Sequence, residues 1–270
     1  MISVIIPTYN RPNELAELLQ SLFLQTFKLF EVIIVNDCGS SISHIVALYP
    51  ELNITLIDLP ENKKHVHARN VGLSHAKYEY ILLCDDDDLL LSDHIEVAWE
   101  QLGTNDLIYT DVEIVNYESK NGTRYPKKRI VFAYEYDKAL MRTFSTFVSS
   151  GCLYKKDIHN KIGPFSEDMY NYWDWDFILT VSERFKVKRL PRASVLYEFS
   201  DGGTNESKKL TSKRHSYLER LCSKHNLGEL SQENFFSLLQ KPELLARRAV
   251  TEILWDGTPI ISRVFKQVQY

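Results

Sequence analysis

Short, nearly continuous apolar stretches alternate with helical patterns along the first part of the chain. The apolar stretches end at proline or at polar residues, and they cover positions 2–6, 31–35, 54–59 and 80–84. Between them, apolar residues recur at helical spacing over 12–23, and helices also fit 42–48 and 68–76. Apolar strands that alternate with helices are typical of a parallel sheet covered by helices. The pattern therefore predicts an α/β fold, with a mostly parallel sheet and helices on both faces.

The pattern changes in the middle of the chain. An amphipathic helix is predicted over 92–102 and a strand over 107–115. Residues 117–129 are polar and end in the basic run 124–129, which we interpret as a solvated loop. A contact of this run with an anionic acceptor or with lipid headgroups is the alternative.

The last part of the chain is predicted to be mainly helical. A helix opens at Trp173, a last strand fits 195–199, and from about 210 the chain reads as helical throughout. The segments 244–254 and 260–268 combine basic and aromatic residues, a composition also found in helices that lie on membranes. We favour packing on their own domain or on a partner subunit, and a peripheral membrane contact is the alternative.

Polar residues at the carboxyl ends of the strands are the candidates for a binding site, because ligands of such sheets bind there. All of them are expected to face one crevice. Taken singly, Tyr9 could be a packing residue, Asp37 a turn or helix cap, and Arg69 a surface charge. The candidates are Thr8, Tyr9, Asn10 and Arg11 after the first strand, Asp37 after the second, Asn62 to Lys64 after the third, Arg69 on the next helix, and Asp85 to Asp88 after the fourth strand.

Four consecutive carboxylates follow the fourth strand directly. If the extended backbone persists, Asp85 and Asp87 share one face while Asp86 and Asp88 share the other. Two carboxylates that converge would repel each other, and a divalent cation such as Mn²⁺ or Mg²⁺ removes that conflict by accepting oxygen ligands. The alternative is an acidic surface loop that caps the following helix.

Composition and charge narrow the class of protein. The chain has 270 residues, of which 44% are hydrophobic and 25% charged, as in an ordinary globular protein. A net charge of -4 gives no reason to expect a nucleic-acid partner. The four cysteines are far apart, no signal peptide is evident, and no apolar run approaches a membrane span in length, so we expect a cytoplasmic protein. The sequence has neither a Gly-rich dinucleotide-binding motif nor a P-loop.

Four ordered motifs carry a resemblance to a known family. They are Ser-Val-Ile-Ile-Pro-Thr-Tyr-Asn-Arg-Pro at 3–12, Glu-Val-Ile-Ile-Val-Asn-Asp at 31–37, Ala-Arg-Asn-Val-Gly-Leu at 68–73 and Leu-Leu-Cys-Asp-Asp-Asp-Asp at 82–88. In this order and spacing they resemble the successive motifs of family 2 glycosyltransferases, which have the GT-A fold. The likeness is close over about 1–100 and looser to about 200.

The resemblance implies roles for the candidates at the strand ends. Tyr9 would stack on the nucleobase, Asp37 would accept a hydrogen bond from its ring N–H, and Arg69 would lie beside the base or the phosphates. These roles suit the residue types, because an aromatic face fits a flat base and a carboxylate fits a uracil N–H. The remaining members of the implied donor-binding set are Thr8, Arg11, Asp85 and Asp86.

The resemblance also implies a metal site and a catalytic base. Asp87 would ligate Mn²⁺ or Mg²⁺, with Asp85 between the ribose and the metal. The family places its base in an acidic pair at the start of a helix, and the aligned residue here is Asp174. A tryptophan, Trp173, replaces the usual Glu of that pair.

The assignment of the base leaves neighbouring carboxylates open. Asp near a helix N-terminus is also what capping requires, so Asp176 is interpreted as a cap or an orienting residue. Because the family's Glu is missing, the base could instead be Asp176, Asp168 or Glu167.

A glycine-rich segment follows the last strand. In the family, the segment equivalent to 200–207 often orders over the donor. Its frequent Arg and His are absent here, with Glu198 and Ser200 near their places, and His215 is expected on a helix surface.

The expected function is inverting transfer of a sugar from a nucleoside diphosphate donor to a glycan hydroxyl. The donor is expected to be a UDP-sugar, and the acceptor a glycan or a lipid-linked glycan in bacterial surface polysaccharide synthesis. Residues 1–100 would form the nucleotide-sugar-binding half, 101–207 the acceptor-binding half and 208–270 a helical C-terminal extension.

Two rival functions are consistent with carboxylates in a nucleotide crevice. A sugar nucleotidyltransferase would need a Gly-rich, basic phosphate loop near the first strand, and the sequence has none. A non-catalytic module that binds sugar nucleotides or a divalent cation fits the Asp run alone, but it does not require the acidic residues after Trp173.

Overall fold

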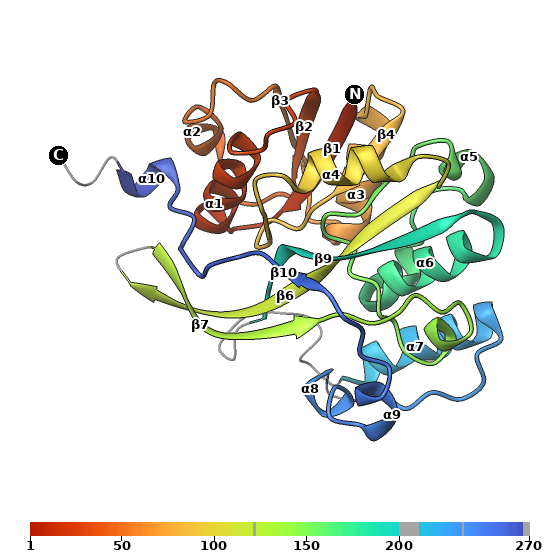
Figure 1. Ribbon diagram of the computed structural model, residues 1–270. Coiled ribbons are helices and arrows are strands. Elements are labelled where there is room, and N and C mark those ends of the chain that lie inside the picture. The colour runs from red at the N-terminus through yellow and green to blue at the C-terminus, as the bar shows by residue number, and fades with distance from the viewer. Residues whose placement is uncertain (121–122, 200–210, 234, 267–270) are drawn as a thin grey trace.

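The computed structural model describes residues 1–120, 123–199, 211–233 and 235–266. Its main sheet has the strand order β10-β9-β6-β8-β4-β1-β2-β3 (Figure 1). The first part of the chain contributes β1 (Ile2–Thr8), β2 (Phe30–Asn36), β3 (Ile54–Asp58) and β4 (Tyr80–Leu83). Later parts contribute β5 (Leu89–Leu90), β6 (Leu107–Lys120), β7 (Thr123–Phe132), β8 (Leu153–Lys155), β9 (Val187–Glu198) and β10 (Glu252–Ile253).

Most neighbouring strands of the main sheet are parallel. The four strands β1 to β4 pair in parallel, as do β6 with β9 and β9 with β10. Strand β8 is antiparallel to both β4 and β6, and β5 and β7 pair antiparallel with β9 and β6. The predicted α/β fold with a mostly parallel sheet is confirmed.

Helices cover both faces of the sheet, because successive strand residues point to opposite faces and both sets are apolar. In β1, Val4 belongs to the core under one helical layer and Ile5 to the core under the other. The first layer holds α1 (Pro12–Phe23), α2 (Ser43–Val46) and α4 (His94–Leu102). The second holds α3 (Lys64–His75), α5 (Ile158–Ile162), α6 (Trp173–Arg184) and α7 (Ser212–His225), with the 3₁₀ helices η1 (Leu140–Arg142) and η2 (Glu167–Tyr172) nearby.

Local sequence explains why the first elements form where they do. Helix α1 begins at Pro12, whose fixed backbone angle suits a first helical position, and it buries Leu15, Leu18 and Leu22. Helix α3 lies so close to β1 at Gly72 that a Cβ atom on this residue would meet the Ile5 side chain at 2.5 Å. That close approach holds α3, and the residues at its start, beside the carboxyl end of β1.

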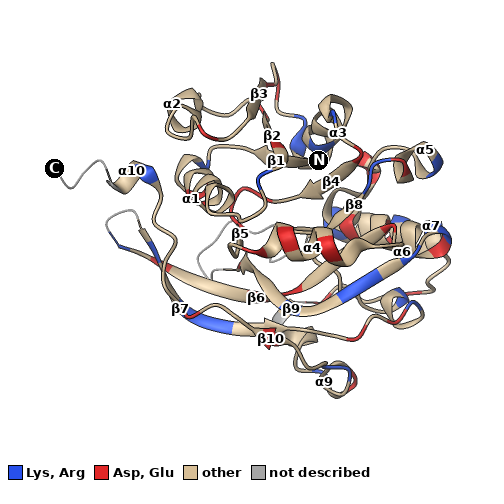
Figure 2. Cartoon of the chain, turned by 45° about the horizontal axis from the view of Figure 1, so that its top comes forward, with Lys and Arg blue, Asp and Glu red and all other residues tan. Residues whose placement is uncertain are grey.

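The polar stretch 117–129 is not the solvated loop that we expected. Strand β6 continues to Lys120, and β7 returns alongside it as a long antiparallel hairpin. Figure 2 shows several Lys and Arg positions along β7. Two of these arginines, Arg124 and Arg129, form ion pairs with glutamates of the same chain. Residues 121 and 122 of this stretch lie outside the described residues.

The C-terminal segment is less helical than its pattern predicts. After α7, the described residues contain only the short helices α8 (Phe235–Leu238), α9 (Pro242–Leu245) and α10 (Arg263–Lys266). The predicted helix over 244–254 is wrong, because Glu252 and Ile253 add β10 to the sheet beside β9. Similarly, the strand expected at 195–199 belongs to the longer β9, which starts at Val187.

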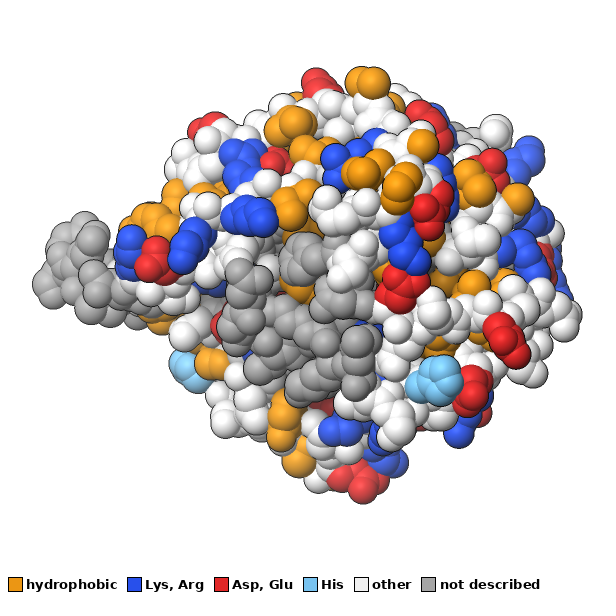
Figure 3. Space-filling model, turned by 90° about the horizontal axis from the view of Figure 1, so that it is seen from below, with side chains coloured by type: hydrophobic (Ala, Val, Ile, Leu, Met, Phe, Trp, Pro, Cys, Tyr) orange, Lys and Arg blue, Asp and Glu red, His pale blue; other side chains and the backbone are white. Residues whose placement is uncertain are grey.

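The described part of the segment 260–268 packs on its own domain, as we favoured. The Arg263 guanidinium lies over the rings of Phe23 and Tyr49, at 4.3 and 4.9 Å from their centres, and pairs with Glu51 at 2.8 Å. Figure 3 shows the molecule from below, where basic, acidic and hydrophobic side chains are interspersed. Among the described residues, no helix has both the length and the apolar content needed to cross a membrane.

Candidate active site

A cleft of about 850 Å³ opens at the carboxyl ends of β1, β2 and β4. Its walls come from these strand ends, from the start of α3, from the turn into α6, from the middle of β6 and from the ends of β7 and β9. The arrangement follows from parallel pairing, which brings the carboxyl ends of neighbouring strands to one edge. Of the residues expected at this crevice, Lys63 and Asp88 do not line it. All the residues to which the resemblance assigns a role do: Thr8, Tyr9, Arg11, Asp37, Arg69, Asp85, Asp86, Asp87 and Asp174.

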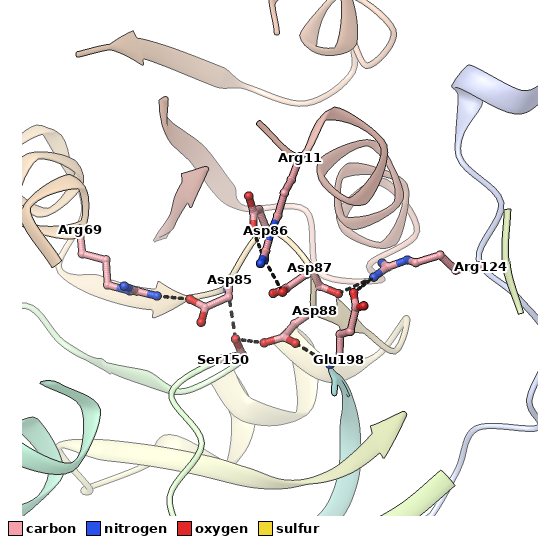
Figure 4. A network of polar contacts seen from close by, with 9 residues as sticks. All are labelled: Arg11, Arg69, Asp85, Asp86, Asp87, Asp88, Arg124, Ser150 and Glu198. Carbon is pink, nitrogen blue, oxygen red and sulfur yellow. Dashed lines mark hydrogen bonds and ion pairs between the residues drawn. The ribbon is translucent and has the colours of Figure 1, made fainter. Parts of the chain in front are cut away.

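The four aspartates after β4 do not alternate between two faces. The backbone turns after Asp85, whose carbonyl accepts a hydrogen bond from the Asp88 amide at 3.2 Å. As Figure 4 shows, Asp85 pairs with Arg69, whereas Asp86 and Asp87 both reach Arg11. The Arg11–Asp86 distance is 3.2 Å, and Arg11 also forms an ion pair with Asp87. Our prediction that Asp86 and Asp88 share a face is therefore wrong, because the extended backbone ends before the run.

Asp88 anchors the run rather than lining the cleft. Its carboxylate is fully buried, where it accepts a hydrogen bond from the Ser150 hydroxyl and another from the Glu198 amide at 2.9 Å. Ser150 also accepts a hydrogen bond from the Asp85 amide at 3.1 Å. These bonds tie the aspartate run to the segment before β8 and to the end of β9.

The cleft aspartates have too few positive partners for their burial. Burial raises the pKa of Asp86 to about 6 and that of Asp87 to about 7, although the Arg11 charge acts in the opposite direction on both. Neighbouring carboxylates raise both values further. A cation near Asp87 and Asp85 would offset this accumulation of negative charge.

The donor set of the cleft fits Mn²⁺ or Mg²⁺, which prefer carboxylate oxygens. No group of three or more His, Cys, Asp or Glu side chains within the described part of the chain is arranged to hold a metal by itself. A cation held by Asp85 and Asp87 would therefore keep water or ligand oxygens in its other positions, as Mg²⁺ commonly does.

The part of the cleft beside the carboxyl ends of β1 and β2 contains Tyr9 and Asp37. Tyr9 is 49% exposed, so its ring is accessible. Asp37 is buried, and its two carboxylate oxygens accept hydrogen bonds from the amides of Lys63 and Lys64, each at 2.7 Å. Asp37 thus stabilises the start of α3, which matches the helix-cap alternative. Each oxygen retains a second lone pair that could accept a bond from a ligand.

Arg69 lines the cleft and is only 2% exposed. Its guanidinium is placed between Asp85 and the ring face of Trp173, whose centre is 4.0 Å away. The Nε and Nη1 atoms of Arg69 have no hydrogen-bond partner among the residues that the structure describes. From the sequence, Trp173 was interpreted only as the residue that replaces the family's Glu. The contact of its ring with the Arg69 guanidinium was not predicted.

Asp174 lies at the start of α6 and faces the same cleft. Burial raises its pKa to about 6, and the nearby Asp85 charge adds to that effect. A hydrogen bond from the Trp175 amide, at 2.8 Å, and the Arg69 charge act in the opposite direction. A carboxylate in this environment can take up a proton near neutral pH.

The other carboxylates considered for the base do not line the cleft. Glu167 and Asp168 are exposed, and Glu167 contacts His67 at 3.0 Å. Asp176 is buried on the other side of α6, where it pairs with Lys224 and His225 of α7, each at 2.7 Å. The start of α6 has no side-chain cap, so the predicted capping role of Asp176 is wrong, and Asp176 joins two helices instead.

We expect Asp176→Asn to lower the free energy of unfolding by about 2 kcal/mol, since hydrogen bonds to charged groups contribute on this scale. Chemical denaturation would measure the change. The cleft should stay unaltered, because Asp176 does not line it. A normal free energy of unfolding would contradict this role.

Two further expectations concern the segment after β9. Residues 200–207, including Ser200, lie outside the described residues. Glu198 lines the cleft and pairs with Arg124. His215 is on the surface of α7, 3.5 Å from Glu219, as predicted.

Comparison with known proteins gives a consistent result. The model of the family described as "Glycosyl transferase family 2" matches residues 3–163. An uncharacterized glycosyltransferase of Bacillus subtilis (strain 168), YwdF, is 50% identical over 265 residues, which cover 98% of this chain and 99% of that protein. An uncharacterized glycosyltransferase of Haemophilus influenzae is 30% identical over 184 residues, covering 66% of this chain and 61% of that protein.

Solved structures show the same fold at low sequence identity. S. aureus TarS 1-349 in complex with UDP-GlcNAc has a TM-score of 0.67 at 22% identity, over 91% of this chain and 72% of that one. The mannosyltransferase PcManGT from Pyrobaculum calidifontis, in complex with GDP-Man and Mn²⁺, has a TM-score of 0.60 at 17% identity, over 85% of this chain and 65% of that one. By its family match and its half-identical relative, the chain belongs to glycosyltransferase family 2.

Proposed function

We propose that the protein is a metal-dependent, inverting glycosyltransferase that moves a sugar from UDP to a hydroxyl group of a glycan acceptor. The observation that carries this proposal is the position of Asp174, a half-buried carboxylate with raised pKa, in the same cleft as the Asp85–Asp87 carboxylates. The UDP-GlcNAc complex of TarS supports a uridine donor by likeness of fold.

Each residue has a part in the proposed reaction. Tyr9 stacks on the base and Asp37 accepts its ring N–H, while Arg69 contributes positive charge beside the base or the diphosphate. Asp85 and Asp87 would hold a divalent cation, which when bound would offset the charge of the departing diphosphate. Asp174 takes the proton of the acceptor hydroxyl as that oxygen attacks the anomeric carbon. A single protein carboxylate acting on the acceptor gives inversion.

The remaining donor-binding residues hold the loop and the strand end that meet the donor. Thr8 ends β1 and lines the cleft, and Arg11 pairs with both Asp86 and Asp87. In this proposal, residues of β1 to β4 bind the donor, and residues from β6 onward bind the acceptor. We propose a glycan or lipid-linked glycan acceptor in bacterial surface polysaccharide synthesis, in keeping with the bacterial relatives.

Transfer assays with a panel of sugar nucleotides and glycan acceptors, with Mn²⁺ present, test the proposal. A preceding thermal-shift screen would identify the donor, since a ligand at 100 times its Kd stabilises the fold by about 2.7 kcal/mol. Donor binding without transfer or donor hydrolysis would favour a non-catalytic binding module. Formation of a sugar nucleotide from a sugar phosphate would favour a nucleotidyltransferase.

We expect Asp37→Ala to weaken UDP binding by about 1.5–3 kcal/mol, the range for a hydrogen bond that involves a charged group. Calorimetry with UDP, and with CDP for selectivity, would measure this loss. Because Asp37 also accepts hydrogen bonds from the backbone amides of Lys63 and Lys64, thermal unfolding of the variant must be measured in parallel. Unchanged UDP affinity in a folded variant would make Asp37 a structural residue only.

A further inference from the structure

Arg124 is a buried arginine that the proposed reaction does not use. It lies on β7 and is 6% exposed. Its Nε pairs with Glu17 of α1, and its Nη1 pairs with Glu198 at the end of β9. The same Nη1 donates a hydrogen bond to the backbone carbonyl of Asp87 at 3.0 Å. One guanidinium therefore connects two secondary-structure elements to the aspartate run (Figure 4).

The partners of Arg124 fix its position. Glu17 is 2% exposed, and burying its carboxylate without a positive partner would be unfavourable. The guanidinium also lies over the ring of Tyr117, with its centre 4.8 Å away. Because the fork of an arginine has a fixed geometry, the contacts of Nε and Nη1 can be made together only in one orientation.

The contact with Asp87 is made to the backbone, not to the carboxylate. The side chain of Asp87 is thus left facing the cleft and Arg11, while Arg124 restrains its main chain from the opposite side. A second contact restrains the same run: the backbone amide of Glu198 donates a hydrogen bond to the buried carboxylate of Asp88 at 2.9 Å. The run is therefore held at two successive residues.

We infer that Arg124 is a positioning residue, which sets where the carboxylate of Asp87 lies by holding its backbone against α1 and β9. This inference rests on the proposed function, which assigns the metal and the diphosphate to the same run. It also gives the β6–β7 hairpin a role in the donor site, although the hairpin comes from the half of the chain assigned to the acceptor.

The test compares Arg124→Lys with Arg129→Lys. Lysine keeps the positive charge but has only one side-chain nitrogen, so it cannot make the contacts with Glu17, Glu198 and the Asp87 carbonyl together. Arg129 is a matched control on the same strand, because it pairs with Glu113 at 2.7 Å and with the carbonyl of Trp255 at 2.6 Å, and it does not line the cleft.

The first measurement is hydrogen exchange of the peptide that covers residues 84–91, in protein without ligand. We expect faster exchange in Arg124→Lys and wild-type exchange in Arg129→Lys. The second is calorimetry with UDP and Mn²⁺, where Arg124→Lys should weaken binding about 10–100-fold, as for other residues that support metal ligands. Donor KM should rise by a similar factor, with a smaller change in kcat.

Wild-type exchange and wild-type affinity in Arg124→Lys would overturn the inference, as would equal effects of both variants. If wild-type protein did not bind UDP, the proposed function would fail, but the exchange measurement would still decide whether Arg124 restrains the run.

Should Arg124→Lys not fold, Glu198→Gln replaces it, since it weakens one contact of the guanidinium. We then expect the same changes in smaller size, and their absence overturns the inference.

Discussion

Asp174→Asn is expected to lower kcat about 10²–10⁴-fold while UDP affinity stays close to normal. A general base acts in the transition state and contributes little to ground-state binding. Asparagine has nearly the same shape as aspartate but cannot take up the acceptor proton. The asparagine side-chain oxygen can still accept the hydrogen bond that the Trp175 amide donates to Asp174 at 2.8 Å. The start of α6 should therefore be preserved. Initial rates at saturating donor, together with UDP calorimetry, measure the two quantities.

Two carboxylates of the same region provide matched controls. Glu167→Gln removes an exposed carboxylate that contacts His67, and Asp176→Asn removes the buried contact with α7. Neither side chain lines the cleft, so both variants should keep turnover within a few-fold of wild type. More than about a tenth of wild-type turnover in Asp174→Asn, with a large loss in either control, would mean that another carboxylate is the base.

The same assignment predicts an acid limit to activity. The pKa of Asp174 is raised to about 6, mainly by burial, so the basic form is lost as the pH falls through that value. The pH profile of kcat/KM reports the free enzyme, and we expect it to decline below about pH 7, since Asp87 titrates in the same window.

The first half of the fold is predictable because its signals are local. Each of β1 to β4 is an apolar run of its own, and each is closed by a proline or by polar residues. The cleft follows from these strands by geometry alone, since parallel strands deliver their carboxyl ends to one edge. For this reason the sequence alone is enough to place residues as far apart along the chain as Tyr9 and Asp87 in one site.

The features that sequence analysis missed depend on partners far away in the chain. The backbone turn of the aspartate run and its anchoring to Ser150 have no signal in the run itself. The sequence of strand β7 resembles that of a polar loop, because the glutamates that pair with Arg124 and Arg129 lie on α1, β6 and β9. Strand β10 is only two residues long and exists through its pairing with β9, so its pattern could not be separated from a helix.

Removing divalent cations is expected to abolish transfer and to weaken UDP binding strongly. The physical reason is the charge of the cleft, where the burial of Asp86 and Asp87 raises their pKa to about 6 and 7 even with Arg11 in contact. A diphosphate adds further negative charge to this site, and the two would repel without a cation. Activity after exhaustive chelation, and after return of Mn²⁺ or Mg²⁺, measures the dependence. Full activity without metal would contradict it.

The pH dependence of metal-supported UDP binding provides the sharper form of this test. A carboxylate must lose its proton to ligate a cation, and the raised pKa of Asp87 means that protons compete near neutral pH. The affinity should therefore fall as the pH drops from 8 to 6, by up to about tenfold per unit for each proton displaced. Asp87→Asn should lose both the affinity and its pH dependence. Asp93→Asn is the control, because Asp93 pairs with Arg192 outside the cleft. Equal pH dependence in wild type and Asp87→Asn would place the cation on other residues.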